Sequence, residues 1–311
     1  MAESTETRQF AVEQLDRLLG QLAFQISRIL RPHDSSSVHN LRVAVRRFSR
    51  ALLVFGPCFP SKDVKRIRRR LDEIMIPARA LRDCDLAMDL LSASKAAHAT
   101  ALRARLGRQR KDAEHMLLST LRRWMERKTS LKWRTRLQNA LTMTKKTLPG
   151  TAEEAAAGIL PDLAREFFDC GRQAMQAEGS VDALHQFRIA AKKFRYTLEL
   201  FTPLYGPALR VWLERVESVH VLAGGIDDCS SARKLLAEAH IDSVNAELGK
   251  KQRKHIEEFR RQWTEGFASP DGARHWIHYL QHFTAKPQTA RKPIARSASA
   301  SNVSSRSVQR A

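Results

Sequence analysis

One stretch of sequence occurs twice in this chain. Residues 38–52 read VHNLRVAVRRFSRAL and continue to Phe55, and residues 184–198 read LHQFRIAAKKFRYTL and continue to Phe201. Each copy has a histidine, an arginine, a basic pair, a phenylalanine and a leucine in the same order. A repeat of this length predicts that the chain contains two copies of one structural unit.

Both copies fit an amphipathic helix, in which successive residues are about 100° apart. The apolar residues of the two copies, spaced four and three apart, are Leu41, Val45, Phe48, Leu52 and Phe55, and Phe187, Ala191, Phe194, Leu198 and Phe201. The polar side carries a stripe of His39, Arg42, Arg46 and Arg50, and a second stripe of His185, Arg188 and Lys192. The pattern predicts a seam for a helix bundle and a cationic face turned away from it.

A cationic face on one helix is usually a solvated surface. Two matched stripes, each led by a histidine, favour binding instead. One helical turn rises about 5.4 Å, so each stripe offers about one cation or donor per turn along a line. Such a line suits an extended polyanion better than a compact ligand. Arginine binds phosphate oxygens in a bidentate manner, whereas Lys192 and Lys193 act more as point charges.

A second repeated block supports an internal duplication. Residues 83–91 read DCDLAMDLL and residues 228–236 read DCSSARKLL. Asp83 follows His39 by 44 residues, and Asp228 follows His185 by 43. No run alternates apolar and polar residues for long enough to indicate a strand. We therefore predict an all-α fold of two antiparallel four-helix bundles related by a pseudo-twofold axis.

The predicted helices also divide the chain into segments. An N-terminal tail covers residues 1–8, the first bundle about 9–148, the second about 152–282, and a disordered basic tail 283–311. We expect Pro77 to kink or break the third helix, which begins at Ser61, and Gly224-Gly225 to interrupt the helix that begins near Arg210. Arg66 and Arg69 lie opposite the apolar seam of that third helix. A further helix is expected within residues 131–148.

Charge and cysteine content limit the class of protein. The chain has 311 residues, 54 of them Lys or Arg against 33 Asp or Glu, for a formal net charge of +21. This excess favours nucleic acid, another phosphate polymer or an anionic membrane as partner. Four scattered cysteines without a CxxC pair indicate a reducing compartment, and neither a signal peptide nor a membrane span is expected. We expect a soluble cytoplasmic protein.

The two motifs His-x-x-Arg-Val-x-x-Arg-Arg-Phe (39–48) and His-x-x-Arg-Ile-x-x-Lys-Lys-Phe (185–194) resemble the signature of the CHAD family, the conserved histidine α-helical domain. The block Arg82-Asp83-Cys84-Asp85 resembles the second recurring element of that family. The resemblance covers roughly residues 10–283. It implies two four-helix bundles around a basic central cavity that binds inorganic polyphosphate, and association with polyphosphate granules in bacterial cells.

The resemblance, together with the stripes, gives a set of candidate polyphosphate-binding residues: His39, Arg42, Arg46, Arg47, Arg50, Arg66, Arg69, His185, Arg188, Lys192, Lys193 and Arg195. The second copy departs from the first in its lysine pair. It also has Gly224-Gly225-Ile226-Asp227 where the first copy has Arg82 before its aspartate. These departures predict a second half that binds phosphate with less defined geometry.

Other functions remain open at this point. The main alternative is a nucleic-acid-binding protein that uses the same stripes. A third is a phosphoanhydride hydrolase acting through His39, Asp83 and Asp85, although these aspartates fit helix caps or partners of arginine better. The five tryptophans fit a core better than a base-stacking surface. Common nucleotide-binding, metalloprotease and hydrolase motifs are missing, as is the Glu-x-Glu-x-Lys signature of the triphosphate tunnel domain found in some CHAD proteins. We expect no enzyme activity, no cofactor and no metal.

Overall fold

A computed structural model describes residues 6–31, 35–93, 100–139, 141, 150–177, 180–238, 242–269 and 271–282. Within these ranges the regular structure is helical, and the all-α prediction is confirmed. The helices are α1 (Thr7–Ile29), α2 (Ser35–Val54), α3 (Ser61–Ala93), α4 (Thr100–Glu126), α5 (Thr129–Asn139), α6 (Ala152–Gln176), α7 (Val181–Phe201), α8 (Ala208–Glu238), α9 (Asp242–Gly266) and α10 (Gly272–His282), with the 3-10 turns η1 (Gly56–Cys58) and η4 (Thr202–Leu204). The tail predicted for residues 283–311 lies outside the described residues.

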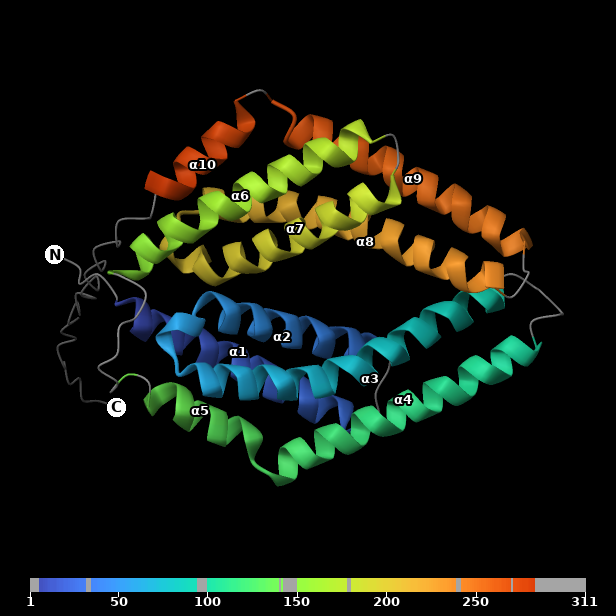
Figure 1. Cartoon of the computed structure of the whole chain (residues 1–311), viewed down its shortest axis with the longest axis horizontal. Coiled ribbons are helices and arrows are strands. Elements are labelled where there is room, and N and C mark those ends of the chain that lie inside the picture. Colours follow the sequence, from blue (N-terminus) through green and yellow to red (C-terminus); the bar gives the residue numbers. More distant parts are fainter. Residues whose placement is uncertain are drawn as a thin grey trace, which may run out of the picture.

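The order of elements in α1–α5 repeats in α6–α10, with η1 and η4 at the same place. In Figure 1 the two sets form two layers, and α3 and α8 converge at the end of the molecule away from the start of α1 and the end of α10. A short fifth helix, α5 or α10, joins the four expected in each layer. The repeated order is compatible with an internal duplication.

Equivalent elements of the two halves meet each other. Contacts join α1 to α6, α2 to α7 and α3 to α8. An antiparallel bridge pairs Glu6 with Thr151, the residues that precede α1 and α6. Contact between equivalent residues is what an approximate twofold axis between the halves produces.

The apolar seams of both motif helices are buried, as the periodicity predicts. Each seam residue is at most 2% exposed. One continuous apolar core spans both halves, and aromatic rings pack where the halves meet. Phe10 stacks on Phe201 at 5.8 Å between ring centroids, and Phe55 meets Phe201 edge to face at 5.6 Å. The two bundles therefore share a core, and neither buries its own seam alone.

The predicted breaks at Pro77 and Gly224-Gly225 do not occur. Helix α3 continues through Pro77, and α8 continues through the glycine pair. A proline inside a helix costs about 3 kcal/mol, but Pro77 is buried and is followed by the fully buried Ala78, so tertiary packing offsets that cost. At Gly225 an added Cβ would lie 3.1 Å from Nε2 of His255, so the glycine permits close packing of α8 on α9.

A second, smaller apolar cluster joins the C-terminal part of α3 and the N-terminal part of α4 to the C-terminal part of α8 and the N-terminal part of α9. Its members include Cys84, Leu91 and Leu106 from one half and Cys229 and Leu248 from the other. This cluster holds the Asp-Cys segments of α3 and α8 beside each other. Among the described helices, none is both long enough and apolar enough to cross a bilayer.

Candidate anion-binding site

The start of each motif helix carries the stripe that the sequence predicts. On α2, His39 is exposed, and Arg42 and Arg46 are half-buried. On α7, His185, Arg188 and Lys192 are all half-buried. Because α2 packs against α7 while their apolar seams point into the core, both stripes belong to one region of the molecule.

The charges of the two stripes act on each other across the halves. Burial, together with the charges of Arg46, Arg188 and Arg79, lowers the pKa of Lys192 to about 8. Two of these three neighbours, Arg46 on α2 and Arg79 on α3, come from the first half. The stripes are therefore close enough to form one cationic cluster, which we define as His39, Arg42, Arg46, Arg79, Arg82, His185, Arg188 and Lys192.

Arg42 lies in a crowded part of this cluster. Burial lowers its pKa to about 10, with further lowering from Arg46 and Arg82 and opposition from Asp83, so it remains charged at neutral pH. Among the described residues, the buried Nε atoms of Arg42 and Arg188 have no hydrogen-bond partner. A buried guanidinium N–H without an acceptor costs about 1–3 kcal/mol. An anion that accepts from these atoms recovers that cost.

The surroundings of His39 favour its neutral form. Burial and the charges of Arg42, Arg82 and Arg46 lower its pKa, while Asp228 from the other half partly opposes them. An anion bound beside His39 would reverse the effect of these cations and raise the pKa. The exposed ring can then act as a donor to a phosphate oxygen.

The second half has its own carboxylate among the cations. Asp227 Oδ1 accepts a hydrogen bond from His185 Nδ1 at 2.8 Å, and Asp227 Oδ2 lies 3.1 Å from Arg188 Nη1. In the first half the position before the Asp-Cys pair is Arg82, a cation. The cluster is therefore asymmetric in charge, although the two halves contribute corresponding helices to it.

With this geometry in place, comparison with known proteins identifies the architecture. A family model described as the CHAD domain matches residues 13–237, which include both motif helices and most of α8. The chain belongs to the CHAD family.

Two solved structures share the CHAD fold of this chain. The crystal structure of the CHAD domain from the plant Ricinus communis superposes with a TM-score of 0.63 and 20% sequence identity, over 89% of this chain and 93% of that one. PptA from Streptomyces chartreusis superposes with a TM-score of 0.55 and 18% identity, over 84% of this chain and 99% of that one. At these identities the likeness concerns the fold. A search of curated proteins found no match.

Three of the predicted binding residues have side-chain partners within the CHAD fold, and two of them join its two halves. Arg47 donates to Glu199 from Nε at 2.6 Å and from Nη2 at 3.2 Å. Arg195 is buried and forms ion pairs with Glu199 at 3.2 Å and Glu217 at 2.6 Å. Arg50 donates to Thr197 Oγ1 at 2.8 Å. Because the first contact and the last cross from α2 to α7, these cations have a structural partner already.

The remaining predicted residues lie at the margin. Lys193 pairs with Glu166 of α6 at 2.5 Å. Arg66 and Arg69 are exposed on α3, and Arg69 precedes Arg79 by ten residues, about 15 Å along the helix axis. The structure therefore does not bring Arg66 and Arg69 into the cationic cluster.

Two cluster members, Arg79 and Arg82, are absent from the predicted set. They follow Pro77, where a break in the helix was expected, so their continuity with the rest of α3 was not recognised. Their spacing of three residues on one helix face was the available signal. His220 on α8 also lies near the cluster, but burial and the neighbouring Arg195 lower its pKa to about 3 and keep it neutral.

The acidic residues of the repeated block serve different partners. Asp85 accepts from Arg110 Nε of α4 at 2.6 Å, which ties α3 to α4. Burial raises the pKa of Asp83, although the side chain keeps solvent contact, and Arg42 and Arg79 oppose the shift. Within the described ranges, no group of three or more His, Cys, Asp or Glu side chains is arranged to hold a metal.

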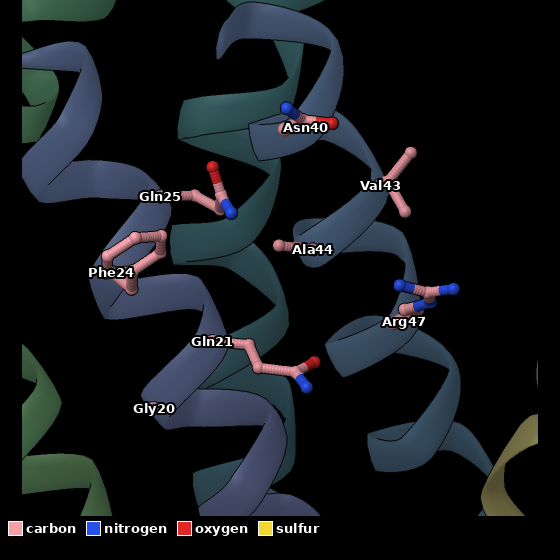
Figure 2. A pocket seen from close by; sticks show the side chains of 8 residues that line it. All are labelled: Gly20, Gln21, Phe24, Gln25, Asn40, Val43, Ala44 and Arg47. Carbon is pink, nitrogen blue, oxygen red and sulfur yellow. The ribbon is translucent and has the colours of Figure 1, made fainter.

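A surface pocket lies to one side of the cluster, between α1 and α2. Its volume is about 470 Å³, and its lining residues are Gly20, Gln21, Phe24, Gln25, Asn40, Val43, Ala44 and Arg47. Figure 2 shows side chains of α1 and α2 bordering it from its two sides. The single cation in this lining, Arg47, is already paired with Glu199. The pocket lacks the positive charge of the cluster, so the cluster is the better candidate for an anion-binding site.

Proposed function

We propose that this CHAD protein binds inorganic polyphosphate through the cationic cluster and does so without catalysis. Polyphosphate binding is a general property of the CHAD family. The cluster draws on α2, α3, α7 and the charges around α8, so its position depends on the family fold. The net charge of +21 adds a long-range attraction for any polyanion.

The observation that carries this proposal is the crowding of half-buried cations from both halves where α2 packs on α7. In keeping with it, burial and the charges of Arg46, Arg188 and Arg79 lower the pKa of Lys192 to about 8. Like charges that crowd one another in this way raise the free energy of the unbound protein. A chain of phosphates placed among them removes the repulsion and accepts hydrogen bonds from the unpaired Nε atoms of Arg42 and Arg188.

The shape of the cluster also fits a linear polyanion. On α2, His39 and Arg46 are seven residues apart, about 10 Å along the axis. A second row of similar length lies on α7. Two rows that act on each other can contact successive phosphates along a chain, whereas a single orthophosphate would reach only part of either row.

Nucleic acid is the competing partner. Single-stranded nucleic acid is usually held by aromatic side chains that stack on the bases, in addition to cations. Trp124, Trp133, Trp263 and Trp276 are each at most 5% exposed, and Trp212 stacks on Trp276 at 4.1 Å between centroids. Four of these rings lie in the core, and Trp212 packs against it. The five tryptophans therefore give the described part of the cluster no stacking surface, which favours polyphosphate.

A competition assay near physiological salt tests this choice. Labelled polyphosphate bound to the full-length protein is challenged with duplex DNA, single-stranded DNA or RNA at equal phosphate concentration. We expect each nucleic acid to displace only a small fraction of the label. Efficient displacement by any of them would favour a general nucleic-acid-binding protein. The salt concentration is fixed because the binding of both classes of ligand weakens as salt rises.

We also propose that the protein resides at polyphosphate granules in the cytoplasm. A fluorescently tagged protein should form foci in cells that accumulate polyphosphate and become diffuse in cells that lack it. Foci that persist without polyphosphate would contradict this location.

Incubation of the purified protein with polyphosphate and Mg²⁺ should release no phosphate above background. Release that is abolished by His39→Ala would show that the protein is an enzyme.

A further inference from the structure

The second half of the cluster contains an acidic residue whose position is cationic in the first half. Arg82-Asp83-Cys84 on α3 matches Asp227-Asp228-Cys229 on α8. The first half therefore has a positive charge at a position where the second half has a negative one. In each half this position lies beside the predicted phosphate-binding residues.

Asp227 uses both carboxylate oxygens on those residues. One oxygen accepts from His185 at 2.8 Å, and the other lies 3.1 Å from Arg188. Its side chain is 24% exposed, and that of Arg188 is 20% exposed. The charge of Asp227 also reaches Lys192. One carboxylate therefore contacts two members of the α7 stripe and acts on the third through its charge.

A carboxylate and a phosphate are the same kind of acceptor for histidine and arginine, because both present negatively charged oxygens at hydrogen-bond distance. A phosphate that bound His185 through Nδ1 and Arg188 through Nη1 would need the places that the two oxygens of Asp227 occupy. The ion pair of Asp227 with Arg188 is half-buried, so solvent screens it less than it screens an exposed pair. Asp227 therefore resists displacement by a phosphate.

We propose that Asp227 is a resident counter-ion that occupies the phosphate subsite of His185 and Arg188 and must be displaced when polyphosphate binds there. This inference rests on the proposed function. The first half, with Arg82 in place of the aspartate, is then the stronger part of the site. The second half binds once the polyanion has displaced Asp227, so affinity is set by a competition within the protein.

The test compares the full-length protein with Asp227→Asn and Asp227→Ala by calorimetric titration with polyphosphate of one defined chain length. We expect both variants to bind about tenfold more tightly, a factor equivalent to about 1.4 kcal/mol. Asp85→Asn is the matched control. It removes the same charge from the equivalent segment of α3, where Asp85 pairs with Arg110 outside the cluster, and should change affinity by less than about twofold.

The outcomes separate this inference from the proposed function. If the wild-type protein binds polyphosphate and neither Asp227 variant binds more tightly than Asp85→Asn, the counter-ion inference is wrong while the proposed function stands. If the wild-type protein does not bind polyphosphate, the proposed function fails first. Arg82→Asp, compared with Arg82→Gln, provides a second route. The aspartate should weaken binding more than the glutamine does, and equal losses would contradict a counter-ion effect.

Discussion

The two halves of this CHAD protein have the same helices and seams, but they hold their cations differently. In the first half, Arg82 lowers the pKa of His39 and adds to the repulsion around Arg42. In the second half, Asp227 contacts His185 and Arg188. The apolar positions must stay equivalent because the halves share one core. The polar positions contact solvent or ligand, so they can diverge without loss of the fold.

The shared core gives the largest expected effect. Phe201→Ala and its equivalent Phe55→Ala should each lower the free energy of unfolding by about 3–5 kcal/mol, because each removes a fully buried ring from the junction of the halves. Denaturant titration followed by circular dichroism should show both halves losing helicity in one transition. Phe24→Ala, at a side chain that is 58% exposed, is the control and should cost far less. Two separate transitions in either core variant would show that the halves fold independently.

Removal of single arginines should reveal the charge asymmetry. Arg42→Ala should weaken polyphosphate binding by about 10- to 30-fold, the lower part of the range for a lost charge-assisted hydrogen bond. Arg188→Ala should cost less, about threefold, since Arg188 is partly neutralised by Asp227 before binding. In an Asp227→Asn background the cost of Arg188→Ala should rise toward that of Arg42→Ala. Equal losses for the two arginines in the wild-type background would contradict the comparison.

The lysine of the second stripe predicts a pH dependence. Lys192 has a pKa of about 8 in the unbound protein, and a bound polyanion raises it. The complex therefore holds more protons than the free protein above pH 8, and affinity must fall as pH rises through that range. Between pH 7.5 and 9 we expect a loss of about three- to eightfold. The Lys192→Arg variant has the residue found at the equivalent position of the first half, Arg46, and its side chain stays charged over this pH range. The variant should therefore lose most of the pH dependence. A variant as pH-sensitive as the wild type would assign the effect to another group.

The smallest effect is expected at the margin of the site. Arg66→Glu and Arg69→Glu should each change affinity by less than about twofold at physiological salt, because both residues are exposed and lie outside the cluster. Calorimetric titration of each variant with polyphosphate, beside Arg46→Glu as a positive control, checks this expectation. A loss similar to that of Arg46→Glu would extend the binding surface along α3.

The sequence predicted the features that depend on local periodicity. The seam from Leu41 to Phe55, its equivalent in α7 and the stripes beside them follow from helical spacing, and burial of the seams confirms the apolar part. The partners of Arg47 and Arg195 could not be predicted in this way. Glu199 lies 152 residues from Arg47, and only the packing of α2 on α7 brings them together.

Local rules also failed where tertiary packing outweighed them. Pro77 and Gly224-Gly225 are breakers by propensity, yet α3 and α8 continue through them because their neighbours are buried. This error hid Arg79, which belongs to the same helix as Arg69 but lies almost three turns further along it. The exchange of Arg82 for Asp227 was visible in the sequence. Its meaning required the contacts of Asp227 with His185 and Arg188.

The central claim is that the stripes of α2 and α7 form one polyphosphate site. The most direct measurement is the polyphosphate affinity of the Arg42→Glu/Arg188→Glu double variant. Its matched control is Arg122→Glu/Arg210→Glu, which makes the same change in net charge at exposed residues of α4 and α8. We expect the first variant to lose at least about 100-fold in affinity with its helicity and Tm close to wild type, and the control to lose no more than about threefold. Equal losses in the two variants would contradict a defined site and indicate binding by net charge alone.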